Sequence, residues 1–179
     1  MDFNIPAELQ NYLEELDAFI EAEIRPLERR DDNIRFFDHR REWARTDFEN
    51  GGMPRREWEE LLGEARRRAD AAGHLRYALP SEFGGKDGTN LGMAVIREHF
   101  ARKGLGLHND LQNEHSIVGN FPQILMLRDF ARDDQKHLIN DALEGRFRAC
   151  FGLTEPDHGS DATHMETVAR PEKRDGVDG

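Results

Sequence analysis

The chain has 179 residues and a formal net charge of −11, with 34% charged and 37% hydrophobic residues. This length suits one domain with a thin core, and the negative charge argues against a nucleic-acid partner, which would require positive charge opposite the phosphates. A single cysteine excludes an internal disulfide. With no long apolar run and no leader-like N-terminus, the sequence predicts a soluble cytoplasmic protein without a membrane span.

Apolar residues at alternating steps of three and four predict a first helix between Leu9 and Leu27. Pro6 suits the first turn of this helix, and Pro26 is expected to kink or end it because proline lacks an N–H group. Residues 31–53 are dense in charged and aromatic side chains. We interpret them as a partly helical insertion packed on the surface.

Two further helices are predicted on either side of a turn-rich loop. One follows Pro54, carries Trp58, and is expected to end at a left-handed Gly73. The next is expected to be capped by Asn90 and to end at Gly104.

The last predicted helices lie between residue 115 and Gly145, before the sequence pattern changes from helical to strand-like. Residues 115–130 favour a helix interrupted near Pro122. A final helix should be capped by Asp133 or Asp134 and stop at Gly145. The apolar residues expected inside this last helix are Leu138, Ile139, Ala142 and Leu143.

The remaining residues predict the opening of a β domain. Residues 147–154 and 166–171 have the length and composition of strands, and residues 174–179 have turn chemistry. We therefore expect a mainly α chain, with a helical domain at 1–146 and the first strands of an incomplete β domain at 147–179. A chain ending at a hairpin turn would lack the next strand, so the sequence predicts a truncated product.

The loop after residue 153 has the chemistry of a ligand-binding loop. Gly159 permits close approach of a ligand, Thr154 and Ser160 carry hydroxyls, and the loop amides can donate to ring carbonyls or phosphates. The alternative is an ordinary turn in which Asp157 and Ser160 bond their own backbone.

Several motifs in order resemble the acyl-CoA dehydrogenase family. Thr154-Glu155-Pro156 and Gly159-Ser160-Asp161 are similar to the motif at the flavin in that family, and Leu79-Pro80-Ser81-Glu82-Phe83-Gly84-Gly85 is similar to its proline and double-glycine loop. The resemblance covers nearly the whole chain. It implies an N-terminal helical bundle domain of that type, followed by the first strands of a β-barrel-like domain.

The resemblance also implies site residues. It places Asn113, Glu114, Val118 and Ser160 beside the acyl-CoA substrate, and the expected FAD contacts are Phe151, Leu153, Thr154, Gly159 and Ser160. Asp157-His158 stands where common members have a small pair, and Phe151 lacks the hydroxyl of a tyrosine found in some relatives.

The activity implied is α,β-dehydrogenation of an acyl-CoA thioester in fatty acid metabolism, with hydride transfer to FAD. The family's catalytic base would lie beyond Gly179, so no catalytic residue is assigned here and the chain alone is expected to be inactive. An electron-transfer flavoprotein and homo-oligomerisation are implied partners of the full-length flavoprotein oxidoreductase. The alternative is a non-catalytic helical interaction module or a degenerate homologue.

Other chemistries have weaker sequence support. Ser160 lacks the glycine two residues later that a nucleophile elbow needs, because Ala162 stands there. Cys150 lies in an apolar stretch typical of an inert buried thiol. No metal site is predicted, because the histidines at 108, 115, 158 and 164 lack the i, i+4 spacing of a helical zinc site.

Overall fold

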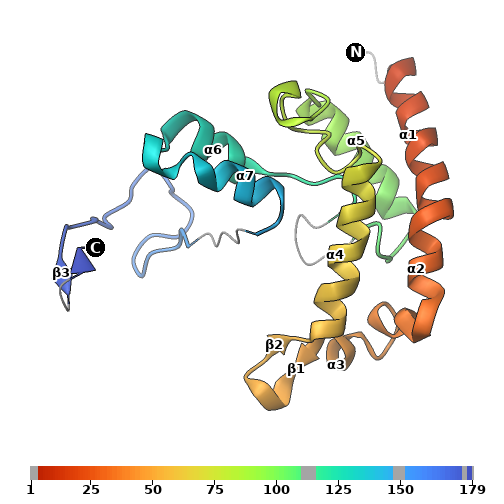
Figure 1. Cartoon of the computed structure of the whole chain (residues 1–179), viewed down its shortest axis with the longest axis horizontal. Helices are drawn as coiled ribbons and strands as arrows, with labels where there is room; N and C mark the ends of the chain where they lie inside the picture. The colour runs from red at the N-terminus through yellow and green to blue at the C-terminus, as the bar shows by residue number, and fades with distance from the viewer. Residues whose placement is uncertain (1–3, 110–115, 147–151, 175–176, 179) are drawn as a thin grey trace. The chain divides into compact units, whose positions relative to one another are not determined.

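The computed structural model describes residues 4–109, 116–146, 152–174 and 177–178. The chain divides into two compact units, Met1–Pro122 and Gln123–Gly179, each described below by itself. The described chain is mainly helical with short strands (Figure 1), which confirms the predicted fold class. The predicted domain division at residue 146 stays a prediction.

The first predicted helix is present and forms one side of the first unit. It consists of α1 (Ala7–Phe19), a π-helical turn (Ile20–Ile24) and α2 (Arg25–Arg29). Pro6 is the N-cap of α1, and Pro26 lies in the first turn of α2, directly after the π-helical turn. The missing N–H of this proline accounts for a local change of helix type rather than an end. The buried face is Leu13, Leu16, Ile20, Ile24 and Leu27.

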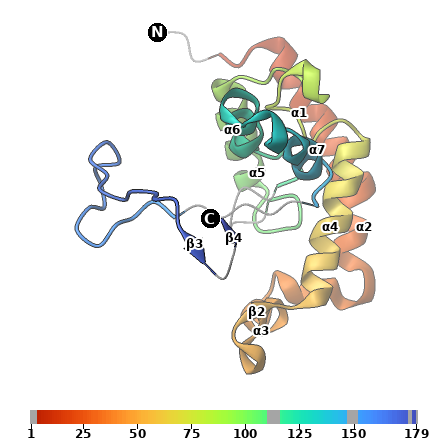
Figure 2. The ribbon, with the colours of Figure 1, turned by 60° about the vertical axis from the view of Figure 1, so that its left-hand side comes forward.

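The charged and aromatic segment folds as short elements at one end of the first unit. A 3₁₀ segment (Arg30–Phe36) precedes α3 (Arg41–Arg45), and a small hairpin pairs β1 (Thr46–Asp47) with β2 (Met53–Pro54). Figure 2 shows α3 and β2 next to the end of α4. The segment was predicted to pack on the surface, but its residue Phe36 is fully buried. The Phe36 ring packs against Trp58 at a ring-centroid distance of 5.2 Å.

The second predicted helix is α4 (Arg56–Ala71), which lies beside α1 and α2 in both views (Figures 1 and 2). Gly73 ends it with a φ of +76°, as predicted. The third helix is α5 (Asn90–Arg102), but its cap is Thr89 rather than Asn90. The Thr89 hydroxyl oxygen accepts the N–H of Gly92 at 3.0 Å. Asn90 is therefore the first helical residue.

Helical structure after residue 115 starts later than predicted. Residues 116–121 are not helical, and α6 (Pro122–Phe130) starts at the proline. A 3₁₀ turn (Asp133–Gln135) is capped at Arg132 instead of an aspartate, and α7 (His137–Leu143) follows. Of the residues expected to face inward in α7, Ala142 is buried and Leu138, Ile139 and Leu143 are half-buried.

The strand predicted at 166–171 is wrong, and the one predicted at 147–154 is tested only at its last three residues. Residues 147–151 lie outside the described residues, and residues 152–154 and 166–171 form no strand. The hairpin instead pairs β3 (Lys173–Arg174) with β4 (Val177–Asp178), so that part of the segment 174–179, predicted to be a turn, is strand. A strand needs a neighbour for its ladder of hydrogen bonds, and the segment 152–172 has no strand partner among the described residues. Its backbone follows an irregular path held by side chains.

None of the helices in the described residues combines the length and the apolar run that a membrane crossing requires.

Candidate functional site

The predicted flavin contacts that the structure describes lie together on one loop of the second unit. Leu153 is half-buried, whereas Thr154, Gly159 and Ser160 are exposed. A Cβ atom built at Gly159 would meet nothing within 4 Å. Phe151 lies outside the described residues. Thr154, Gly159 and Ser160 are thus open to a ligand.

Only some of the predicted substrate residues are among those that the structure describes. Asn113 and Glu114 are among the residues not described, and Val118, in the first unit, is fully buried. Val118 is held by the side chain of Ser116, whose hydroxyl donates to the Val118 carbonyl and accepts the Val118 N–H. Ser160 is the fourth residue of this set.

Glu155 organises the loop that carries the predicted contacts. Its N–H donates to the carbonyl of His158 at 2.9 Å, which closes a tight turn. Its carboxylate accepts the N–H groups of Glu166 at 2.9 Å and Thr167 at 2.7 Å. These backbone donors lower the pKa of the Glu155 carboxyl, because they stabilise its charged form. Residues far along the loop are thereby tied to the turn after Thr154.

A second turn forms at Asp161. The Asp161 carboxylate accepts the N–H and hydroxyl of Thr163, and the Asp161 carbonyl accepts the N–H of His164 at 3.2 Å. The Thr163 bonds lower the pKa of the Asp161 carboxyl. This Asx-type turn fixes the direction in which the chain enters residue 164.

The two turns bring together side chains that sequence reasoning treated separately. The rings of His158 and His164 stack with centroids 4.7 Å apart and planes inclined by 24°. Nε2 of His158 lies 3.6 Å from a carboxylate oxygen of Glu166. The i, i+4 spacing of a helical metal site does not apply to this cluster, because its residues lie on an irregular loop. The only available signal was the density of histidine and glutamate between residues 158 and 166.

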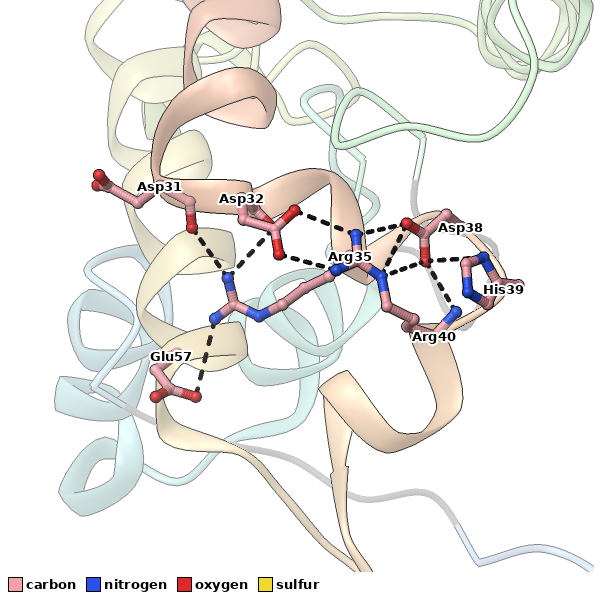
Figure 3. A network of polar contacts seen from close by, with 7 residues as sticks. All are labelled: Asp31, Asp32, Arg35, Asp38, His39, Arg40 and Glu57. Carbon is pink, nitrogen blue, oxygen red and sulfur yellow. Dashed lines mark hydrogen bonds and ion pairs between the residues drawn. The ribbon is translucent and has the colours of Figure 1, made fainter.

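The charged insertion in the first unit is a saturated polar network (Figure 3). Arg40 binds both Asp32 at 2.8 Å and Asp38 at 2.7 Å, and the guanidinium lowers the pKa of the Asp38 carboxyl to about 2. Arg35 donates to the carbonyls of Asp31 and Asp32, which have φ values of +51° and +58°. The carboxylates of this exposed cluster are paired with arginines. We therefore interpret the cluster as a set of contacts that hold the insertion in place, not as a catalytic centre.

A buried polar group in the first unit links α2 to the segment after α5. Glu28, 4% exposed, accepts the N–H of Leu107 at 2.5 Å and a guanidinium hydrogen of Arg25 at 2.7 Å. The neighbouring His108 is fully buried, with Nδ1 4.0 Å from the Glu28 carboxylate. Desolvation lowers the pKa of His108 against the opposing bond to the Phe100 carbonyl. We infer that these buried contacts stabilise the fold of the first unit.

Comparison with known proteins finds distant similarity to acyl-CoA dehydrogenases and to a caffeyl-CoA reductase subunit. It is 28% identical over 171 residues to glutaryl-CoA dehydrogenase of Desulfococcus multivorans, covering 94% of this chain and 37% of that protein. It is 30% identical over 97 residues to the caffeyl-CoA reductase-Etf complex subunit CarC of Acetobacterium woodii, covering 54% of this chain and 24% of the relative. A probable acyl-CoA dehydrogenase of Bacillus subtilis is 31% identical over 104 residues, which is 58% of this chain and 16% of that protein.

These similarities support a distant relationship to the acyl-CoA dehydrogenase family, which is the resemblance that the motifs predicted. It spans 37% or less of the length of these relatives. No protein-family model matches the chain, and no solved structure matches it significantly.

Proposed function

We propose that the chain is the N-terminal part of an FAD-dependent acyl-CoA dehydrogenase that introduces a 2,3-double bond into an acyl-CoA thioester. The observation that carries this proposal is similarity along 94% of the chain to a glutaryl-CoA dehydrogenase. The residues that resemble the family's flavin motif lie on one loop, where Thr154, Gly159 and Ser160 are exposed. The catalytic base, supplied in the family by a later helical domain, is proposed to lie outside these 179 residues.

The loop fits the flavin by its chemistry. Thr154 and Ser160 offer exposed hydroxyls, and Gly159 leaves open space where a side chain would stand. In the proposal these residues hydrogen-bond the ring edge and the adjoining chain of the cofactor, while Leu153 and Phe151 provide apolar contact. When bound, FAD supplies the electron sink for the dehydrogenation. The chain's own contribution is to orient the ring, and Glu155 keeps the loop in shape for this.

The proposed substrate residues complete the assignment. Ser160, Asn113 and Glu114 are proposed to approach the thioester, whereas the fully buried Val118 is proposed to support the apolar wall of the acyl site. An electron-transfer flavoprotein is the proposed electron acceptor, in line with the Etf-complex name of the Acetobacterium woodii relative. A cytoplasmic homo-oligomer is proposed for the whole enzyme.

Titration of FAD with the purified chain tests the proposal. Binding is expected to quench flavin fluorescence, and Gly159→Val should weaken it at least about tenfold because a branched side chain would fill the open approach. Ser160→Ala should weaken it about three- to tenfold through loss of one hydrogen bond. Ser81→Ala, on an exposed turn of the first unit, is the matched control. Equal affinity in all four proteins, or no uptake of FAD, would refute the flavin assignment.

A non-catalytic interaction module is the second candidate function, favoured by exposed apolar residues around the β1–β2 hairpin. Trp43, Phe48 and Met53 are 67%, 50% and 64% exposed, and Trp43 and Phe48 contact each other edge to face. Exposed aromatic clusters are typical of interfaces. If the purified chain takes up no FAD but self-associates in sedimentation experiments, and Trp43→Ser abolishes that association, this candidate replaces the first.

A further inference from the structure

The cluster of His158, His164 and Glu166 has the ligand set of a metal site. One ligand atom from each residue can be chosen so that all three lie within 4.8 Å of one another. Nε2 of His158 is buried and has no hydrogen-bond partner among the described residues. A buried ring nitrogen without a partner is uncommon in folded proteins and calls for a ligand or an ion. The nitrogen lies beside the Glu166 carboxylate, at 3.6 Å.

The backbone around the cluster is already fixed. The Glu155 carboxylate holds the amides of Glu166 and Thr167, and the Asp161 turn holds the amide of His164. These bonds do not use the side chains of the three cluster residues. Neither imidazole nor the Glu166 carboxylate is therefore consumed in building the loop, and all three remain available to a ligand.

We propose that His158, His164 and Glu166 bind a divalent transition-metal ion of the zinc type. Two imidazole nitrogens and one carboxylate oxygen suit Zn²⁺, with a fourth position left for water, whereas Mg²⁺ and Ca²⁺ prefer oxygen ligands alone. This inference departs from the sequence prediction of no metal. It goes beyond the proposed dehydrogenase function and does not rest on it.

The candidate ligand atoms need to move only slightly closer together to bind one metal ion. Metal–ligand distances of about 2.0–2.2 Å in a tetrahedral site place ligand atoms about 3.3–3.5 Å apart. The 3.6 Å between His158 and Glu166 already approaches this separation. His164 is exposed and the Glu166 side chain is 69% exposed, so both can rotate by the remaining ångström without disturbing a core.

The competing explanation is a simple ion pair between a protonated His158 and Glu166. A proton would satisfy the unpartnered ring nitrogen by donating to the carboxylate, and His164 would then be a stacking neighbour with no ligand role. The two explanations differ on His164. An ion pair does not need its nitrogen atoms, whereas the metal site loses one of three ligands without them.

Isothermal titration of ZnCl₂ into the chelator-treated 179-residue chain tests the proposal. We expect one equivalent of Zn²⁺ to bind, with affinity reduced at least about tenfold in His164→Gln and in Glu166→Gln, because each substitution removes a ligand. His39→Gln is the matched control, since this histidine is 88% exposed and lies in the first unit. Its affinity should equal that of the unmodified chain.

A second measurement identifies the coordination. Co²⁺ in place of Zn²⁺ should give the visible absorption of a four- or five-coordinate site, and both ligand variants should lose it. The far-ultraviolet circular dichroism should not change, because residues 158–166 contain no helix or strand. Absence of a one-equivalent Zn²⁺ site, or equal affinity of His164→Gln and the unmodified chain, would overturn the proposal in favour of the ion pair.

Discussion

The buried carboxylate of Glu28 gives the sharpest stability prediction for the first unit. Glu28→Ala removes the acceptor of the Leu107 N–H and the partner of Arg25. A buried amide left without an acceptor costs about 1–3 kcal/mol, and a hydrogen bond to a charged group contributes about 1.5–3 kcal/mol. Arg25 is 23% exposed and can turn to water, which reduces its share. We expect the free energy of unfolding to fall by about 3 kcal/mol.

Urea unfolding followed by tryptophan fluorescence measures this loss. Both tryptophans of the chain, Trp43 and Trp58, lie in the first unit, so the signal reports on the unit that contains Glu28. With an m value of about 2 kcal/mol per molar urea, the midpoint should move down by about 1.5 M. Glu28→Gln keeps an acceptor for the Leu107 N–H but loses the charge opposite Arg25. Its midpoint should lie between those of the other two proteins.

A matched control separates burial from charge. Glu98→Ala removes an acidic residue paired with Arg102 on the exposed face of α5. Exposed pairs of this kind contribute below about 0.5–1 kcal/mol, so its midpoint should stay near that of the unmodified chain. If Glu28→Ala costs no more than Glu98→Ala, the buried bonds to Leu107 and Arg25 do not stabilise the fold, and the reasoning fails.

Three further predictions concern glycines and a buried imidazole. Gly85→Ala should cost about 1–3 kcal/mol in the same urea assay, because its Cβ would overlap the Leu79 carbonyl; an unchanged midpoint would contradict the close approach. Gly63→Ala, inside α4, should instead stabilise by about 0.5–1 kcal/mol, since its Cβ meets only the flexible Arg67 guanidinium at 3.3 Å; a loss of stability would refute this. Burial lowers the pKa of His108, so below pH about 6.5 the unfolded state binds more protons than the folded state. The free energy of unfolding should therefore decrease as the pH is lowered through this range, by up to about 1.4 kcal/mol per pH unit. His108→Gln should flatten this dependence measured from about pH 7.5 to 5.5, and an unchanged slope would contradict it.

The helices could be predicted because their signals are local. The three-and-four spacing between Leu9 and Leu27 corresponds to a face that is buried in the structure. Glycines at 73, 104 and 145 follow helices in the left-handed conformation that only glycine adopts easily. Thr89 rather than Asn90 caps α5 because either residue type can cap, and only the position of the first helical turn decides between them.

The strands could not be predicted with the same success because a strand is defined by its partner. Residues 166–171 have strand-like composition, yet the Glu155 carboxylate takes the amides of Glu166 and Thr167. Those amides would otherwise belong to a ladder between strands. The sequence identified Glu155 as part of a motif, but not as the group that receives these bonds.

The same loop carries both site proposals, and its chemistry keeps them separable. Flavin contacts are assigned to hydroxyls and amides at Thr154, Gly159 and Ser160, whereas the metal ligands are the imidazoles and carboxylate of His158, His164 and Glu166. Substitution at His164 removes a metal ligand without touching an assigned flavin contact, and substitution at Ser160 does the reverse. If either change abolished both FAD and Zn²⁺ binding, the common cause would be collapse of the loop that Glu155 holds, and neither set of residues could be regarded as a site in its own right.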